Sequence, residues 1–379
     1  MCNNPLYRIV IDEIRRERLS PQFCKRVRNG ALILSCEDKE FCRKTYGFPE
    51  AWFVPIPCGS CAGCRIDYSR NWAARCMLES VYHEHKYFIT LTYNDEHLPC
   101  EDVVNPLTGE VLSVNVLRKR DFQLFMKRLR KKIAPARVRV FYSGEYGDRT
   151  DRPHFHCILY GYEFPDRQFF YSVKDGHKRP YHVPGGTDYF ISNELAALWG
   201  NGHCLISNVD TRSCMYVASY CSKKVKSPKN EFDRSRELAK WNGIEQATRH
   251  LPRKLLDVRA IQREFACMSR RPAIGRQFFD DHKDEIYSQD KIPYPFDSKG
   301  LPDHLRYFDN LYAPHQKEWH GLFPNADRLR AFKEIRALKA RGREAIRRRS
   351  SSISAREAQL QAEEILQQKI ERSRSRRDL

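Results

Sequence analysis

The stretch from Val138 to Gly161 constrains the fold of this chain more than any other. It reads VRVFYSGEYGDRTDRPHFHCILYG, in which two runs of alternating apolar residues flank a middle rich in charged and turn-forming residues. Short runs of β-branched and aromatic residues that are bounded in this way are typical of β-strands. We therefore expect two strands here, with the rest of the fold arranged around them.

The second of these strands carries His154 and His156 on one face. Successive side chains of a strand point to opposite faces, so positions i and i+2 share a face and lie about 6.6 Å apart. Glu145 stands where the preceding strand ends, and its carboxylate could reach the same place. Two imidazoles and a carboxylate form a plausible divalent-metal site with open positions for a substrate oxygen, and ligand softness alone would allow zinc or manganese.

The alternative is that both histidines are polar residues on a solvent-facing strand. His83 and His85 have the same spacing, but we place them in a helix. Positions i and i+2 do not share a face in a helix, so we expect these two to be ordinary surface residues.

The chain is strongly basic. Its 379 residues include 67 Lys and Arg against 48 Asp and Glu, a formal net charge of +19, so an acidic polymer or surface is the expected partner. No run of about 18 apolar residues and no signal-peptide pattern occurs, which predicts no membrane span and no export by a cleaved signal. We accordingly interpret the fourteen cysteines as reduced thiols or metal ligands rather than disulfides.

Three of these cysteines lie close together in the segment PCGSCAGCR. Cys58, Cys61 and Cys64 have C-x2-C-x2-C spacing, and glycines let the backbone fold tightly enough for several sulfurs to face one ion. A structural Zn2+ would need a fourth ligand. The candidates for it are Cys76, Cys42 and Cys36. An iron–sulfur centre fits less well, because no fourth cysteine follows at the required spacing, and plain loop thiols are the simplest alternative.

A second informative stretch, TRSCMYVASYCSKKVK, covers residues 211–226. Thr211 or Asp210 can cap a helix there. Tyr216 and Tyr220 are then four residues apart and lie on one face. The next turn adds two basic side chains, Lys223 and Lys224. Tyrosines at this spacing are more often packing residues, so their role depends on whether the helix presents them to the histidine strand.

The remaining periodic segments predict further helices and strands. Expected helices lie near residues 67–85, 117–132 and 192–199, and expected strands near residues 87–93 and 203–209. The first of these strands has one face made of Phe88, Thr90 and Thr92 and another made of Ile89, Leu91 and Tyr93. We interpret residues 95–115 as a loop and residues 162–190 as an insertion rich in aromatic residues, glycine and proline.

We expect an α+β fold with a central antiparallel sheet flanked by helices and an α-rich C-terminal extension. The expected regions are a Cys-rich, irregular and partly β segment at 1–66, a core at 67–226, an α-rich region at 227–326 and a basic, helical and mobile tail at 327–379. The tail holds sixteen Lys and Arg against eight Asp and Glu, which suits contact with nucleic acid. The basic side of the helix at 117–132 could also lie near phosphates.

Three motifs, in this order, resemble those of the HUH endonuclease family, the rolling-circle replication initiators. They are Phe88–Tyr93 (FITLTY), the triplet His154-Phe155-His156, and Tyr216-x3-Tyr220 followed by Lys223. Each motif is weak separately, but the combination is specific, and it covers about residues 86–226. The segments CGSCAGCR, SRRPAIGRQFF and RYFDNLY are further similar to the replication initiators of gokushovirus-type microviruses, small phages with circular single-stranded DNA.

The resemblance implies an HUH/RRM-like sheet in the core and an enzyme that nicks and re-joins single-stranded or supercoiled viral origin DNA through a 5′-phosphotyrosine. It implies Mg2+ or Mn2+ as cofactor, with the two histidines and the glutamate as metal ligands, the two tyrosines as alternating nucleophiles and the two lysines as charge stabilisers. No G-x-x-x-x-G-K-[ST] loop occurs, so a host helicase is an implied partner, together with a host DNA polymerase. The implied location is the cytoplasm of the bacterial host.

Two alternatives remain open. The first is a non-catalytic zinc-knuckle nucleic-acid-binding protein, in which His154 and His156 face solvent and the basic tail binds the nucleic acid. The second keeps the chemistry but changes the biology, as an HUH relaxase or transposase.

Overall fold

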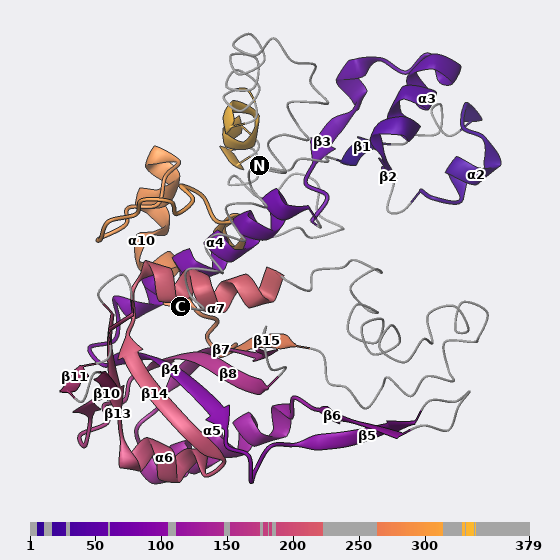
Figure 1. Cartoon of the computed structure of the whole chain (residues 1–379). Helices are drawn as coiled ribbons and strands as arrows, with labels where there is room; N and C mark the ends of the chain where they lie inside the picture. Colours follow the sequence, from indigo (N-terminus) through magenta and orange to yellow (C-terminus); the bar gives the residue numbers. More distant parts are fainter. Residues whose placement is uncertain are drawn as a thin grey trace. The chain divides into compact units, whose positions relative to one another are not determined.

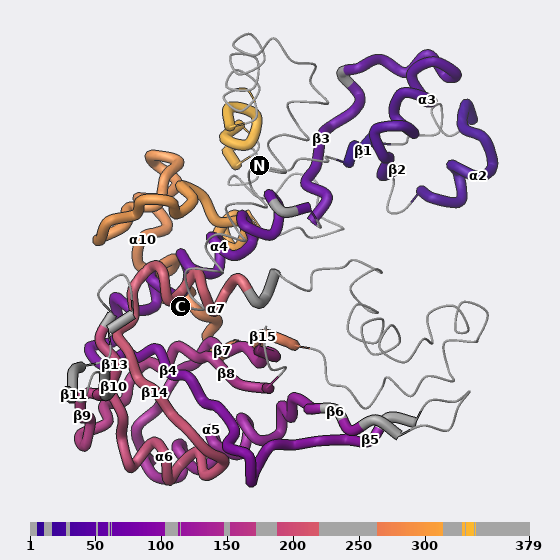
Figure 2. The backbone as a smooth tube through the Cα atoms, viewed as in Figure 1, coloured from indigo at the N-terminus to yellow at the C-terminus, as the bar shows by residue number. Residues whose placement is uncertain are grey.

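The computed structural model describes residues 6–10, 17–27, 31–59, 61–104, 111–147, 152–174, 177–180, 182–183, 187–222, 264–313, 328–329, 331–336 and 338. The chain divides into two compact units, one made of residues 1–67 and 347–375 and the other of residues 68–346 and 376–379. Figures 1 and 2 show the elements of each unit. In the described part of the chain, no helix is long and apolar enough to cross a membrane.

The first unit contains a small antiparallel sheet with short helices. Its strands are ordered β2-β1-β3. They are β1 (Leu6–Val10), β2 (Ala31–Leu34) and β3 (Val54–Ile56), and the helices are α2 (Pro21–Cys24), α3 (Cys36–Tyr46) and the 3-10 turn η1 (Glu50–Trp52). A capping box starts α3, in which the Asp38 N–H donates to the Ser35 hydroxyl at 3.0 Å and the Asp38 carboxylate accepts from the Ser35 N–H. The sheet and helices enclose a core of their own that includes Ile9, Phe23, Leu32, Leu34, Cys42, Phe48 and Phe53.

A mixed set of strands from distant parts of the sequence forms the sheet of the second unit. The path is β12-β13-β14-β4-β8-β7-β15, with β9 paired to β13, and every pairing in it is antiparallel. The central strands are β4 (Lys86–Tyr93), β7 (Arg139–Tyr146), β8 (Pro153–Tyr160) and β14 (Gly202–Asn208). The outer strands are β9 (Gln168–Phe169), β12 (His182–Val183), β13 (Thr187–Ile191) and β15 (Phe265–Met268). The expected α+β class with a central antiparallel sheet is confirmed.

Helices cover both faces of this sheet (Figure 1). On one face, α5 (Lys119–Ile133) and α6 (Asn193–Trp199) bury Phe122, Phe125, Leu129 and Trp199 against Ile89, Leu91, Phe155 and Leu159. On the other, α7 (Thr211–Ser222) and the second-unit part of α4 (Ala62–Ser80) bury Ala73, Cys76, Cys214, Val217 and Ala218 against Phe88, Phe141, Ile158 and Tyr160. Strict alternation along the strands therefore gives each strand two sets of buried residues, which is why these strands are almost continuously apolar.

Several expected elements differ in their bounds or nature. The predicted helix at 67–85 begins earlier, at Ala62, and ends at Ser80, so His83 and His85 lie beyond its end. Their interpretation as helical surface residues is wrong, because His83 is partly buried and its Nε2 lies 3.2 Å from Glu79 Oε1. The predicted loop at 95–115 contains a two-stranded hairpin of β5 (Cys100–Val104) and β6 (Val111–Asn115).

The insertion at 162–190 contributes strands rather than irregular chain alone. It supplies β9, β12 and most of β13, together with a hairpin of β10 (Tyr171–Lys174) and β11 (His177–Pro180). The C-terminal region contains α10 (Arg276–Gln289) and α11 (Arg306–Tyr312), which share a core with Ala74 and Leu78 of α4. It also supplies β15 to the sheet, and most of the basic tail lies outside the described residues.

Candidate active site

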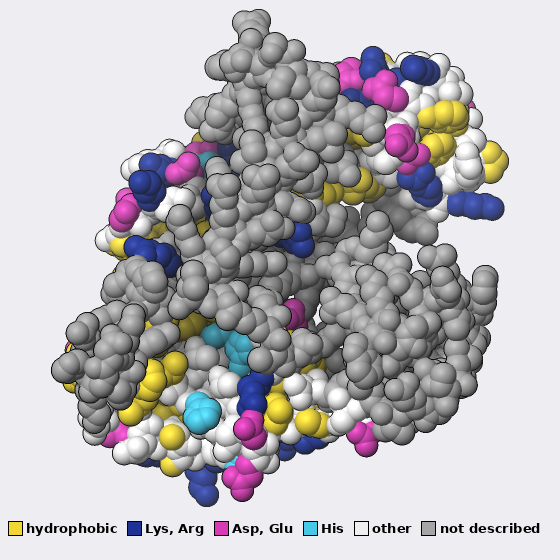
Figure 3. Space-filling view, in the orientation of Figure 1, with side chains coloured by type: hydrophobic (Ala, Val, Ile, Leu, Met, Phe, Trp, Pro, Cys, Tyr) yellow, Lys and Arg dark blue, Asp and Glu magenta, His cyan; other side chains and the backbone are white. Residues whose placement is uncertain are grey.

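Three chemically active side chains meet on the sheet face that α4 and α7 cover. Glu145 of β7 pairs directly across from His154 of β8, and His156 lies two residues further along β8. Because positions i and i+2 share a face, both imidazoles project from the same side as the carboxylate. In the space-filling view, histidine side chains come to the surface over the strands of this unit (Figure 3).

The donor atoms of these side chains converge on one point. Oε1 of Glu145 lies 2.7 Å from Nε2 of His154 and 2.7 Å from Nε2 of His156. The carboxylate is nearly inaccessible, with 2% of its surface exposed. Burial raises the pKa of Glu145, but the hydrogen bonds to His154 and His156 outweigh this effect and lower it to about 2, so the group is an ionised carboxylate.

Neighbouring groups hold each imidazole in a fixed orientation. Nδ1 of His154 lies 3.0 Å from the carbonyl oxygen of Arg152, so Nδ1 carries a proton and donates it to that oxygen. Nδ1 of His156 lies 3.0 Å from the Thr90 hydroxyl, and the ring stacks on Phe88 at a centroid distance of 5.5 Å. These contacts direct both Nε2 atoms toward Glu145, as is usual for metal-binding histidines.

Helix α7 brings Tyr216 to this group. The hydroxyl of Tyr216 lies 3.4 Å from Nε2 of His156, and the two rings meet edge to face at 4.9 Å. Asp210 fixes the start of the helix, because its carboxylate accepts the Ser213 N–H at 2.6 Å while the Ser213 hydroxyl accepts the Asp210 N–H at 2.8 Å. The buried residues Cys214, Val217 and Ala218 then seat the helix on the sheet.

The other predicted catalytic residues are placed less fully. Tyr220 belongs to α7, one turn beyond Tyr216, but its side chain lies outside the described residues. Lys223 and Lys224 lie outside them altogether. Their roles stay predictions.

Two polar residues of the site were not identified as site residues from the sequence. Thr90 contacts His156, and its place on the face shared by Phe88 and Thr92 was available from the alternation of the strand. Ser143 pairs across from His156, is fully buried, and its hydroxyl has no hydrogen-bond partner among the described residues. No sequence pattern marks Ser143, because its position depends on the register between β7 and β8.

The cysteine cluster is only partly assembled as predicted. The sulfurs of Cys58, Cys61 and Cys64 lie within 4.8 Å of one another in the first unit. Cys76 is fully buried in the core between α7 and the sheet and is not grouped with them. Cys42 is buried in the core of the first unit, and Cys36 is exposed.

The chain is similar to replication proteins of small phages. Residues 86–225 match the sequence model of the family of the replication-associated protein ORF2. The chain is 27% identical to replication-associated protein VP4 of Bdellovibrio phage phiMH2K over 273 residues, 70% of each chain. It is 26% identical to replication-associated protein ORF2 of Spiroplasma virus 4 over 274 residues, 71% of this chain and 70% of that protein.

A third relative is replication-associated protein ORF4 of Chlamydia phage 1, with 28% identity over 174 residues, 45% of this chain and 38% of that protein. No solved structure matches the chain significantly. The family match begins at the first residue of β4 and ends just after α7, so it spans the elements that carry the site.

Proposed function

Since the predicted resemblance to the replication initiators of gokushovirus-type microviruses is confirmed, we propose that this chain nicks and re-joins single-stranded origin DNA through a 5′-phosphotyrosine intermediate. The observation that carries the proposal is the approach of the Tyr216 hydroxyl, at 3.4 Å, to an imidazole of the cluster formed by Glu145, His154 and His156. A nucleophile and a set of cation ligands on two different elements, a helix and a sheet, are the parts that phosphodiester cleavage by a tyrosine requires.

The donor set fits a divalent cation. The Arg152 carbonyl accepts the proton on Nδ1 of His154, which leaves Nε2 with its lone pair directed at Glu145. Lone pairs of two imidazoles and a carboxylate at 2.7 Å repel one another unless a proton or a cation lies among them. Mg2+ or Mn2+ held there by Glu145, His154 and His156 would withdraw negative charge from the oxygens of the scissile phosphate. Magnesium or manganese is preferred to zinc because of the family resemblance.

The reaction uses the phenol of Tyr216. A free phenol has a pKa near 10, so only about 0.1% is ionised at neutral pH, and neighbouring positive charge has to stabilise the oxygen as it loses its proton. The phenolic oxygen attacks the phosphorus, the bond from phosphorus to O3′ breaks, and the 3′ oxygen leaves as a hydroxyl. The DNA 5′ end is then esterified to the protein, and the free 3′-hydroxyl can prime synthesis.

Re-joining follows from the same chemistry in reverse. A phosphotyrosine ester preserves the reactivity of the phosphodiester it replaced, so a 3′-hydroxyl can attack it without ATP. Tyr220 lies one helical turn from Tyr216 and could cut the regenerated origin while the first tyrosine still carries DNA. Lys223 and Lys224 follow in sequence and would stabilise the charged transition state.

The proposed test is adduct formation. The protein is incubated with origin-containing single strands and Mn2+, and the mixture is run on a denaturing gel. We expect a protein–DNA band that survives denaturation, needs the cation and disappears after nuclease digestion. No adduct with any divalent metal, together with intact DNA binding, would leave the non-catalytic binding protein as the better description.

The matched variant for this experiment is the double substitution His154→Ala and His156→Ala. It removes two of the three ligands but none of the basic residues, so cleavage should be lost while salt-sensitive DNA binding is largely kept. Cleavage retained by this variant would refute the assignment of the ligands.

The wider biology also belongs to the proposal. The substrate is the single-stranded or supercoiled viral origin, the partners are a host helicase and a host DNA polymerase, and the site of action is the cytoplasm of the bacterial host. The net charge of +19 agrees with a nucleic-acid substrate.

A further inference from the structure

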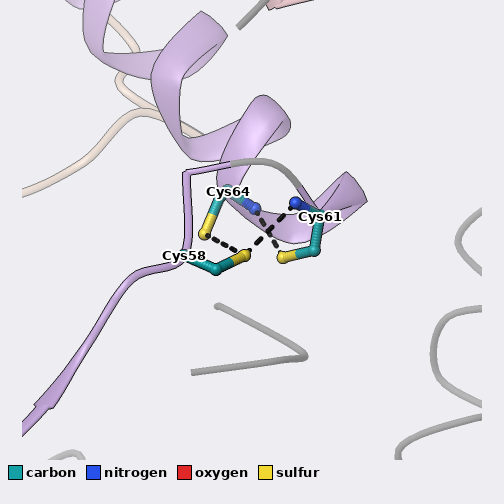
Figure 4. A group of neighbouring side chains, drawn as sticks. All are labelled: Cys58, Cys61 and Cys64. Carbon is teal, nitrogen blue, oxygen red and sulfur yellow. Dashed lines mark hydrogen bonds between the residues drawn. The ribbon is translucent and has the colours of Figure 1, made fainter. Parts of the chain in front are cut away.

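A second group of ligand atoms lies in the first unit, apart from the chemistry of the sheet. Cys58 follows β3 by two residues, Cys61 directly precedes α4, and Cys64 lies in the first turn of that helix. Figure 4 shows the three side chains turned toward a common point at the start of the helix. Among the described residues, this cluster and the histidine site are the two groups whose geometry suits a metal ion.

The separation of the sulfurs suits one shared ion. Sγ of Cys58 lies 3.9 Å from Sγ of Cys64. A disulfide would bring two sulfurs to about 2.05 Å, so these two are not bonded to each other. Two thiolates on a tetrahedral zinc ion, each about 2.3 Å from it, lie about 3.8 Å apart. The observed spacing is therefore that of two ligands of a single zinc ion.

The backbone of the turn donates hydrogen bonds to the sulfurs. The N–H of Cys61 donates to Sγ of Cys58 at 3.3 Å, and the N–H of Cys64 donates to Sγ of Cys61 at 3.4 Å. Gly59 has a φ of +76°, which a residue with a side chain rarely adopts and which folds the chain back between the first two cysteines. N–H donors and the start of a helix both favour the thiolate form, which is the form that binds metal.

We propose that Cys58, Cys61 and Cys64 bind a structural Zn2+ that ties the end of β3 to the start of α4. Thiolates select zinc among the common divalent ions, and an iron–sulfur cluster is disfavoured because its cysteines bind different irons and stand further apart. A water molecule or a ligand other than these three completes the tetrahedron. The proposal does not depend on the nicking activity.

The experiment measures zinc in the full-length protein. Because the histidine site could also take up zinc, the measurement is made in the variant that carries His154→Ala and His156→Ala. We expect about one zinc ion per chain, retained through dialysis, as for a closed structural site. Adding Cys61→Ser should remove it, whereas Cys100→Ser, at an exposed cysteine outside the cluster, should leave it in place.

A second measurement covers the case in which the Cys61→Ser variant does not fold. Zinc is replaced by Co2+ in the protein with both histidines substituted, and the absorption spectrum is recorded. Intense thiolate-to-cobalt charge-transfer bands are the expected result. A protein that contains no tightly held zinc and shows no such bands would overturn the proposal, and so would iron that co-purifies with the visible absorption of an iron–sulfur cluster.

Discussion

The hydroxyl of Thr90 lies 3.0 Å from Nδ1 of His156, on the side of the ring opposite Glu145. Groups that hold the second nitrogen of a ligating histidine commonly change metal affinity by about 10–100-fold when they are removed. We expect Thr90→Val, which keeps the shape of the side chain, to raise the Mn2+ concentration needed for half-maximal cleavage by about this factor. Titration of Mn2+ in the adduct assay measures it.

Thr92 provides a matched control for this prediction. It lies on the same strand and face as Thr90, pairs across from His154, and its hydroxyl makes no side-chain hydrogen bond in the described structure. Thr92→Val should therefore leave the Mn2+ requirement unchanged. Equal effects of the two substitutions would mean that the change acts through the packing of β4 and not through His156.

Tyr216 and Tyr220 should differ in the first cleavage. Because the hydroxyl of Tyr216 already lies beside His156, we expect Tyr216→Phe to reduce adduct formation on a single-turnover substrate to background. Tyr220→Phe should allow this first cleavage and block re-joining that needs a second one. The control is Tyr82→Phe, since the Tyr82 hydroxyl bonds to Asp281 away from the site. An adduct formed by the variant with both Tyr216 and Tyr220 replaced would place the nucleophile elsewhere.

At the level of residues, the sequence reached the chemical types of the site but not its contacts. His154 and His156 share a face because a strand has a period of two, and this follows from the sequence alone. Glu145 was selected because it stands near a strand end, whereas its proximity to both imidazoles depends on its register opposite His154. Register between strands is a tertiary property, which is why Ser143 and the Arg152 carbonyl could not be identified in advance.

Among the elements, α4 is fixed to the sheet by a buried ion pair. Glu79, with 4% of its surface exposed, pairs with Arg139 of β7 and accepts the Gly275 N–H at 2.7 Å. We expect Glu79→Gln to destabilise the protein by about 3 kcal/mol, because Arg139 is left without its charged partner. Urea denaturation followed by circular dichroism measures this. Glu84→Gln, at an exposed position, is the control and should have little effect.

The same pair gives a pH dependence. Burial raises the pKa of Glu79, but the hydrogen bonds from His83 and Gly275 and the charge of Arg139 lower it further than burial raises it. A carboxyl group whose pKa is lowered by folding contributes stability that is complete at neutral pH and is lost as the pH falls through that lowered value. The difference in stability between Glu79→Gln and the unchanged protein should therefore shrink in acid.

Helix α5 presents basic residues on the side of the sheet away from the candidate active site. Four of its exposed basic side chains have no ion-pair partner in the described structure; they are Arg120, Lys127, Arg130 and Lys131. For duplex DNA, each phosphate that a basic side chain no longer neutralises should reduce the slope of log affinity against log salt by about 0.9. We expect Lys127→Gln, Arg130→Gln and Lys131→Gln together to weaken duplex binding and reduce this slope.

Cleavage of a saturating single-stranded oligonucleotide should be unaffected by these changes, because α5 and the histidines occupy opposite faces of the sheet. Fluorescence anisotropy at several salt concentrations provides the slopes. The control carries Lys291→Gln and Lys299→Gln, at exposed positions elsewhere. A control that loses as much affinity would show that net charge, not this face of the helix, determines binding.

Elements with a long period were predicted well, and short ones were not. The amphipathic pattern of α5 and the capping residue Asp210 of α7 were sufficient to place those helices. The β5–β6 hairpin was missed because five-residue strands carry little pattern. The sequence of β15, FACM, resembles any short apolar segment, and only its pairing with β7 makes it a strand.

For the whole molecule, the core of the second unit depends on the C-terminal region. Phe278, Phe279 and Phe308 are buried with Ala74 and Leu78 of α4. A fragment that ends at residue 226 lacks these residues, so the apolar side of α4 that they cover would face water. We expect this fragment to be insoluble or to melt at a much lower temperature than one that ends at residue 313. Equal melting temperatures for the two fragments would contradict this expectation.

The edge strand β15 bears on how such genes can recombine. It pairs with Phe141–Gly144 of β7, yet it lies about forty residues beyond the end of the family match at residue 225. A chimera that exchanged only residues 86–225 between two phages would combine the sheet of one parent with the bordering strand of the other. Crossovers placed after Met268 would transfer both partners of this pairing together, and these are the exchanges that should yield viable hybrid replicators.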